Sequence, residues 1–245
     1  MMKEYIELLD KYYEILSSLD VTFFDKHHPN TKFHEKTGLS GVFLSSLPEN
    51  YFQAKNKIMI IGSETTGWDI LQKQPYLGLK EYINSSVEKH NIFFQKQLSL
   101  QKRKAITFHD FTRLVAEKSG KNGIVYSNLF CFSWKRGSPI KNENFHLIKD
   151  ISKKLLIAQL DFFKPEIIIF ANGMSSVKHR REYFPLANCT NTVIYEDEGI
   201  SKDHLWKFDY DKKYLCYRIQ HPSTIRGRVS AEKARQKLIS LLPEI

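Results

Sequence analysis

Residues 57–69 read KIMIIGSETTGWD, and this stretch decides how the rest of the chain is interpreted. The unbroken apolar run at 58–61 is typical of a strand buried on both faces, as in parallel sheets covered by helices. Gly62 permits a sharp turn, and the polar residues after it project beyond the strand's carboxyl end, where open α/β sheets bind ligands. A strand followed by a helix capped by Ser63 or Thr65, with Glu64 in solvent, is the alternative.

Composition limits the classes of protein and of partner. The chain has 245 residues and 42% hydrophobic content, which is enough for a large core in one domain. It carries 37 Lys and Arg against 27 Asp and Glu, so its charge of +10 favours an anionic partner such as nucleic acid. The three cysteines are widely separated, which favours neither disulfide bonds nor a set of metal ligands and suits a reducing cytoplasm. We expect the protein to be a cytoplasmic monomer. No signal peptide or apolar stretch of membrane-spanning length is recognised, so no membrane partner is expected.

The periodicity of apolar residues predicts alternating helices and strands. Helices are expected over 5–19, 79–94, 108–117, 144–162 and 230–242. Strands are expected over 58–61, 123–134, 167–170 and 214–219. This alternation predicts an α/β fold, a three-layer α/β/α arrangement around a central, mostly parallel sheet. We expect a single domain over 1–245 with an N-terminal helical extension at about 1–55, and residues 174–210 receive no assignment.

Two further clusters have ordinary explanations. His27, His28 and His34 lie in a polar, turn-rich stretch without the spacing of a ligand set, so no metal site is expected. The basic run at 101–104 is either a solvated face or a contact to phosphate.

Three of the apolar strands are followed by, or end near, a different polar residue. These are Glu64, Asn128 and His221. Because the carboxyl ends of parallel strands meet at one edge of a sheet, the three side chains are predicted to converge there.

The motifs around these residues resemble the uracil-DNA glycosylase superfamily. They are GSETTG at 62–67, GIVYSN at 123–128 and HPST at 221–224, and they occur in the family's order. The resemblance covers most of the chain from Lys57 onward. It implies a uracil-DNA glycosylase-like domain that binds DNA, flips a nucleotide out of the stack and cleaves its N-glycosidic bond without metal or cofactor.

The resemblance implies two catalytic residues and a reader of the base. Glu64 would activate water and offset the positive charge of the sugar, and His221 would donate a hydrogen bond to the departing base. Asn128 would bind the Watson–Crick edge through its amide. The alternatives are a loop histidine that caps the following helix and an asparagine that ties two loops together.

The first motif departs from the uracil-specific pattern Gly-Gln-Asp-Pro-Tyr. In the uracil-specific enzymes the tyrosine of that pattern excludes bases substituted at carbon 5, and in this chain Thr66 occupies the position of that tyrosine. A modified pyrimidine, such as a modified cytosine in viral DNA, is therefore the expected substrate. The remaining predicted substrate-binding residues are Gly62, Ser63, Thr65, Tyr76 and Ser223, with Trp68 as second choice for the aromatic that stacks on the base. A core position is the alternative for either aromatic.

DNA contacts are predicted after the His-Pro-Ser loop. Ile225 stands where the family places an apolar wedge, and Arg226 and Arg228 flank it at positions suited to phosphates. A lid on the last helix and ordinary surface charge are the alternatives.

Two other functions stay open. One is a nucleic-acid-binding protein with this fold that has lost turnover, against which the acid at Glu64 and the imidazole at His221 both count. The other is an unrelated α/β hydrolase or transferase acting on nucleotides, although the Gly62 loop lacks the glycines and lysine of a phosphate cradle. Repair and antiviral defence are both compatible with the glycosylase prediction.

Overall fold

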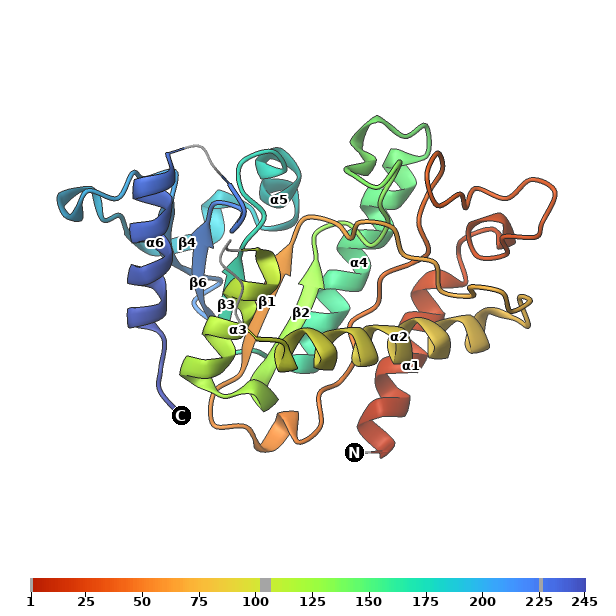
Figure 1. The fold of residues 1–245 in the computed structure, drawn as a ribbon, viewed down its shortest axis with the longest axis horizontal. Helices are drawn as coiled ribbons and strands as arrows, with labels where there is room; N and C mark the ends of the chain where they lie inside the picture. The colour runs from red at the N-terminus through yellow and green to blue at the C-terminus, as the bar shows by residue number, and fades with distance from the viewer. Residues whose placement is uncertain (1, 102–106, 225–226) are drawn as a thin grey trace. The chain divides into compact units, whose positions relative to one another are not determined.

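A computed structural model describes residues 2–101, 107–224 and 227–245. It confirms the predicted α/β class: a mostly parallel sheet flanked by helices, consistent with a three-layer α/β/α fold. The strands of this sheet, shown in Figure 1, are β1 (Ile58–Gly62), β2 (Ile124–Asn128), β3 (Ile167–Phe170), β4 (Cys189–Val193), β5 (Leu205–Tyr210) and β6 (Tyr214–Ile219). The α-helices are α1 (Met2–Leu16), α2 (Leu79–Ser99), α3 (Phe108–Ser119), α4 (Phe145–Phe163), α5 (Val177–Tyr183) and α6 (Arg228–Leu241).

The strand order in the sheet is β2-β1-β3-β6-β5-β4. β1 and β6 each pair in parallel with β3, whereas β5 runs antiparallel to both β6 and β4. Every residue of β1 and β3 is buried, as expected for apolar strands covered on both faces. Because β1, β3 and β6 run parallel to one another, their carboxyl ends lie at the same edge of the sheet.

One prediction about strands needs correction, and the region 174–210, which received no assignment, contains α5, β4 and all of β5. β4 is an edge strand whose residues are mostly exposed, so its sequence CTNTV carries no apolar signal. The strand predicted over 123–134 ends at Asn128, and the apolar residues 129–132 that follow are buried without belonging to a strand. Burial, and not strand pairing, explains their apolar character.

The chain divides into two compact units, each built from separate segments. Unit 1 comprises residues 1–47, 63–93 and 128–164, and unit 2 comprises residues 48–62, 94–127 and 165–245. Within unit 1, α1 packs against α4, and the hydroxyl of Tyr12 donates to the carbonyl of Ser45 at 2.8 Å. The N-terminal residues are therefore an integral part of unit 1.

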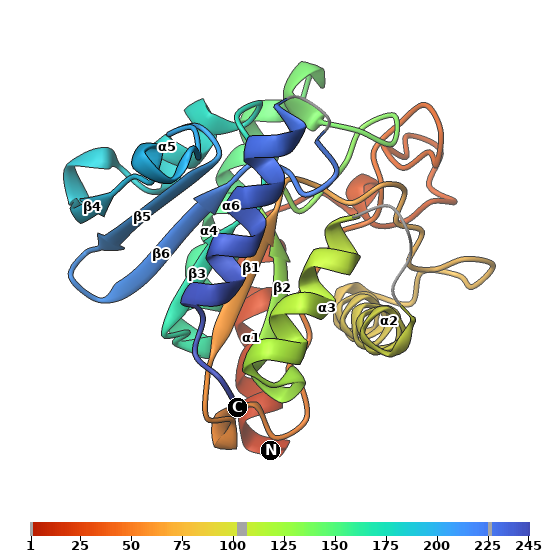
Figure 2. The same ribbon diagram turned by 60° about the vertical axis from the view of Figure 1, so that its left-hand side comes forward.

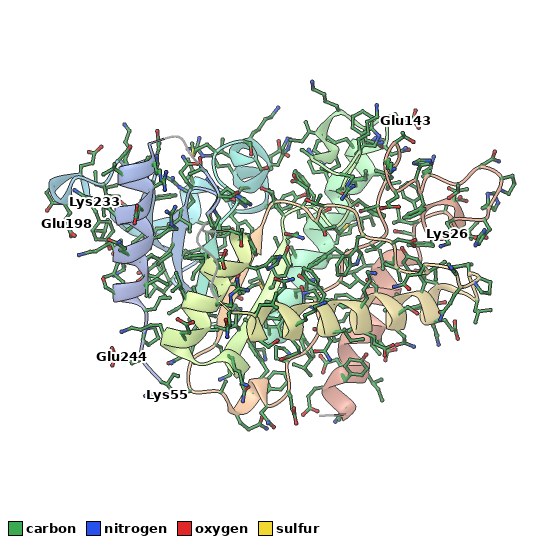
Figure 3. All side chains as sticks on the ribbon, viewed as in Figure 1. Lys26, Lys55, Glu143, Glu198, Lys233 and Glu244 are labelled. Atoms are coloured by element: carbon green, nitrogen blue, oxygen red, sulfur yellow. The ribbon has the colours of Figure 1, made fainter. Side chains whose placement is uncertain are left out.

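Unit 2 contains β1, β3, β4, β5, β6 and all of β2 except Asn128. Its last helix, α6, packs against β5 and β6 and also contacts α3 (Figure 2). At the end of the chain, Glu244 pairs with Lys118 and lies near Lys55 (Figure 3).

Candidate functional site

The loop that follows β1 carries the predicted acid. Ser63, Glu64 and Thr65 are half-buried and Thr66 is exposed. Glu64 has no hydrogen-bond or ion-pair partner among the described residues, and burial raises its pKa to about 7. A carboxyl group that titrates near neutral pH, with no cation paired to it, is suited to accept a proton from water.

This loop is fixed on both sides of Glu64 within unit 1. The carbonyl of Ser63 accepts a hydrogen bond from the amide of Phe130 at 2.9 Å, and the carbonyl of Trp68 accepts one from Gly41 at 2.6 Å. Further along the loop, the carboxylate of Asp69 forms an ion pair with the ammonium of Lys26 at 3.5 Å (Lys26 is labelled in Figure 3). The position of Glu64 is thus set by the backbone around it, since its own side chain bonds to none of the residues that the structure describes.

The two candidate stacking aromatics both pack inside unit 1. Tyr76 stacks on Phe24 with 6.5 Å between ring centroids, and its ring lies 6.2 Å from that of Tyr82. Trp68 is 5% exposed and packs against Phe43 at 5.2 Å. These contacts account for both rings structurally, and their stacking on a base stays a prediction.

Asn128 is the last residue of β2 and is buried, with 5% of its surface exposed. The amide of Phe130, two residues later, is the group that binds Ser63. An asparagine amide that binds the edge of a base and one that links two loops by hydrogen bonds would both be buried. The burial of Asn128 is therefore compatible with both interpretations.

His221 lies in unit 2, two residues after β6, and its imidazole is half-buried. The backbone N–H of Ser223 donates to its Nδ1 at 3.4 Å, and the Ser223 hydroxyl lies 2.7 Å from the same atom. A backbone N–H can only donate, so Nδ1 must be unprotonated and the proton of the neutral ring resides on Nε2. Burial lowers the pKa of His221, which favours this neutral form. The imidazole is therefore arranged as a hydrogen-bond donor through Nε2.

Residues that the sequence analysis did not single out hold the His221 loop in place. Arg235 is 8% exposed, and its Nη1 donates to the carbonyl of Pro222 at 3.3 Å. Gly173, after β3, adopts φ of +64°, and a Cβ added there would lie 3.2 Å from the backbone nitrogen of His221. Arg180 in turn donates to the carbonyl of Gly173 at 3.1 Å. Gly173, three residues after the strand 167–170, was the one sequence signal that could have indicated this support.

Aromatic rings from the N-terminal turn of α3 and from β2 complete the surroundings of His221 in unit 2. The Phe108 ring lies 6.0 Å from the imidazole at an interplanar angle of 31°, and 5.0 Å from the ring of Tyr126. His109 packs edge-on to Tyr126 at 5.8 Å, and burial lowers its pKa to about 4. The imidazole of His221 therefore borders apolar surface, which explains the burial that lowers its pKa.

The other predicted residues are distributed as follows. Gly62 ends β1 in unit 2, Ser223 is exposed with its hydroxyl on His221, and Arg228 is the exposed first residue of α6. Ile225 and Arg226 lie outside the described residues, as does most of the basic run at 101–104. Glu64 and Asn128 belong to unit 1 and His221 to unit 2, and their joint action on one nucleotide stays a prediction.

A scan against protein-family models and a search of curated proteins found no match to this chain. The likeness to glycosylases therefore depends on the three motifs and on the chemistry of their side chains.

The described residues were searched for metal-binding groups and for membrane-spanning helices. They contain no group of three or more His, Cys, Asp or Glu side chains that could hold a metal ion. In the histidine-rich stretch, Nδ1 of His28 accepts from the amide of Asn30, and Nδ1 of His34 accepts from the amides of Lys36 and Thr37. These histidines thus stabilise turns. None of the described helices combines the length and the apolar character needed to cross a bilayer.

Proposed function

We propose that this protein is a monofunctional DNA glycosylase that removes a modified pyrimidine. The observation that carries the proposal is the state of His221: Ser223 fixes a neutral imidazole with its proton on Nε2, at the sheet edge where β1, β3 and β6 all end. A neutral N–H donor is suited to bind the oxygen of a departing base, on which negative charge develops.

Glu64 supplies the second half of the proposed reaction. It follows two residues after the end of β1, and its pKa of about 7 leaves a large fraction ionised at neutral pH. In the reaction, the carboxylate takes a proton from water, the water oxygen bonds to C1′ of the sugar, and the C1′–N bond breaks. The bonding electrons leave with the base, whose anion accepts the hydrogen bond from Nε2 of His221. The carboxylate also offsets the positive charge of the oxocarbenium-like sugar.

The substrate follows from the first motif. Thr66 is exposed and much smaller than the tyrosine that excludes 5-substituted bases in the uracil-specific enzymes that the motifs resemble. A pyrimidine with a substituent at carbon 5 is therefore the proposed substrate class, and modified cytosines of viral DNA belong to it.

The direct test is mass spectrometry of the bases released from genomic DNAs that carry different natural modifications. We expect the wild type to release a modified pyrimidine. Glu64→Gln should abolish release but leave DNA affinity nearly intact, because the amide keeps the shape and removes the basic group. Glu143→Gln, at an exposed glutamate of the same unit, is the matched control and should stay active. DNA binding without release from any DNA would show a binding protein, and uracil as the best substrate would contradict the modified-base assignment.

A further inference from the structure

A tight turn in unit 1 has an unusual sequence for its backbone shape. Trp134 and Gly137 exchange two backbone hydrogen bonds, each 2.9 Å long, so Lys135 and Arg136 form a two-residue hairpin turn. Both central residues are left-handed, with φ of 50° for Lys135 and 64° for Arg136. Positive φ at both positions is the geometry of a type I′ turn, for which Asn-Gly, Asp-Gly and Gly-Gly are strongly preferred.

Lysine and arginine are poor choices at these positions, because their Cβ atoms crowd the backbone when φ is positive. The surrounding chain nevertheless enforces the turn. The amide of Lys135 donates to the carbonyl of Gly38 at 3.0 Å, Leu39 bridges to Trp134, and the amide of Ser40 donates to Ser133 at 2.9 Å. Strained backbone that its surroundings hold in place clusters at functional sites. The strain at Lys135 and Arg136 therefore suggests a function for their side chains.

The two side chains present positive charge to solvent. Both are exposed, and neither has an acidic partner among the residues that the structure describes. The ammonium of Lys135 lies 4.3 Å from the centroid of the Trp134 ring, which orients it. The Nε of Arg136 lies 3.7 Å from the position that a Cβ on Gly67 would occupy. The turn therefore presents two cations that lack an acidic partner among the described residues, and it places one of them, Arg136, beside Gly67 of the loop that carries Glu64.

We propose that the turn at Trp134–Gly137 is a binding site for the phosphodiester backbone of DNA, with Lys135 and Arg136 as its two cationic contacts. This inference rests on the proposed function and adds to it a site that positions the strand next to the Glu64 loop. Arginine binds phosphate through its planar guanidinium, and the lysine adds a second point charge. The strain is retained because the residues that would relieve it, Asn and Gly, carry no charge.

The test uses fluorescence anisotropy of a labelled DNA strand, alone and as a duplex, over a series of salt concentrations. The variant Lys135→Asn with Arg136→Gly installs the preferred turn and removes both charges. The variant Lys135→Arg with Arg136→Lys keeps the charges. Lys11→Gln with Lys154→Gln is the matched control, because it removes two cations from α1 and α4 of the same unit.

Two lost phosphate contacts should reduce the slope of log K against log salt by about 1.4 to 1.8, since each contact contributes about 0.7 to 0.9. The Asn-Gly variant should show this reduction together with a higher urea midpoint, whereas the charge-keeping variant and the α1/α4 control should retain the wild-type slope. An unchanged slope in the Asn-Gly variant, an equal reduction in the control, or a wild type that binds neither form of DNA would overturn the proposal. A wild type that binds DNA but releases no base would contradict the glycosylase function alone and leave the turn as a DNA site.

Discussion

Replacing Glu64 by glutamine should stabilise the protein at alkaline pH while it removes activity. The carboxyl group is half-buried and has no partner among the residues that the structure describes, and its pKa is raised from 4.5 to about 7 because burial disfavours the charged form. A carboxyl whose pKa is higher in the folded than in the unfolded chain opposes folding once it must ionise. Glutamine has a similar shape and no charge, so it removes this cost.

The magnitude follows from the two pKa values. The interval from 4.5 to about 7 corresponds to about 3 kcal/mol at 1.36 kcal/mol per pH unit, and partial exposure of the side chain reduces this to about 2 kcal/mol. Below pH 4.5 the group is protonated in both states, and the variant should match the wild type. The folded wild type holds the extra proton between pH 4.5 and 7, so its stability falls relative to the variant over that window and the gap is complete above pH 7.

The assay is urea unfolding of the wild type and Glu64→Gln at about pH 4, 6 and 8. Glu143→Gln serves as the control, since Glu143 is exposed and its replacement should leave the pH dependence of stability unchanged. A gap that does not widen with pH, or one of the opposite sign, would refute the reasoning, because it would mean that Glu64 is ionised at no cost in the folded protein.

Three other outcomes are expected. Base release by the wild type should rise about tenfold per pH unit below pH 7 and level off above it, because Glu64 acts in its ionised form; a flat pH–rate profile would exclude it as the base. Gly173→Ala should slow base release and lower the free energy of unfolding by about 1 kcal/mol or more, because φ at this position is +64° and the added Cβ would lie 3.2 Å from the backbone nitrogen of His221. Unchanged kinetics would show that the His221 loop moves to accommodate the methyl group without loss of function. Thr107→Ala should lower the free energy of unfolding by about 1 kcal/mol, measured in urea, because its hydroxyl caps α3 by accepting from the amide of Asp110; no change would mean that the cap contributes nothing.

The central strands were predictable because their signal is local. An unbroken apolar run such as 58–61 or 167–170 can be satisfied only by burial on both faces, and both runs are fully buried strands. The helices α1, α2, α3, α4 and α6 were predictable for the same reason, with errors of a few residues at their ends, where capping and fraying decide, whereas the short α5 lies in the region that received no assignment. β4 was missed because an exposed edge strand owes its existence to pairing with β5 and not to its own residues.

The sequence by itself determined the residue types at the ends of the central strands: an acid two residues after β1, an asparagine at the end of β2 and a histidine after β6. Only the tertiary structure decided their chemical state, because a pKa depends on burial by residues that are distant in sequence, and the tautomer of His221 depends on the fold of the loop that places Ser223 against its ring. Burial raises the pKa of Glu64. Phe108 lies beside the imidazole that Ser223 orients, and Gly173 lies against the backbone of His221. The left-handed turn at Lys135 and Arg136 is of the same kind, since no local preference predicts it and the backbone of residues 38–40 enforces it.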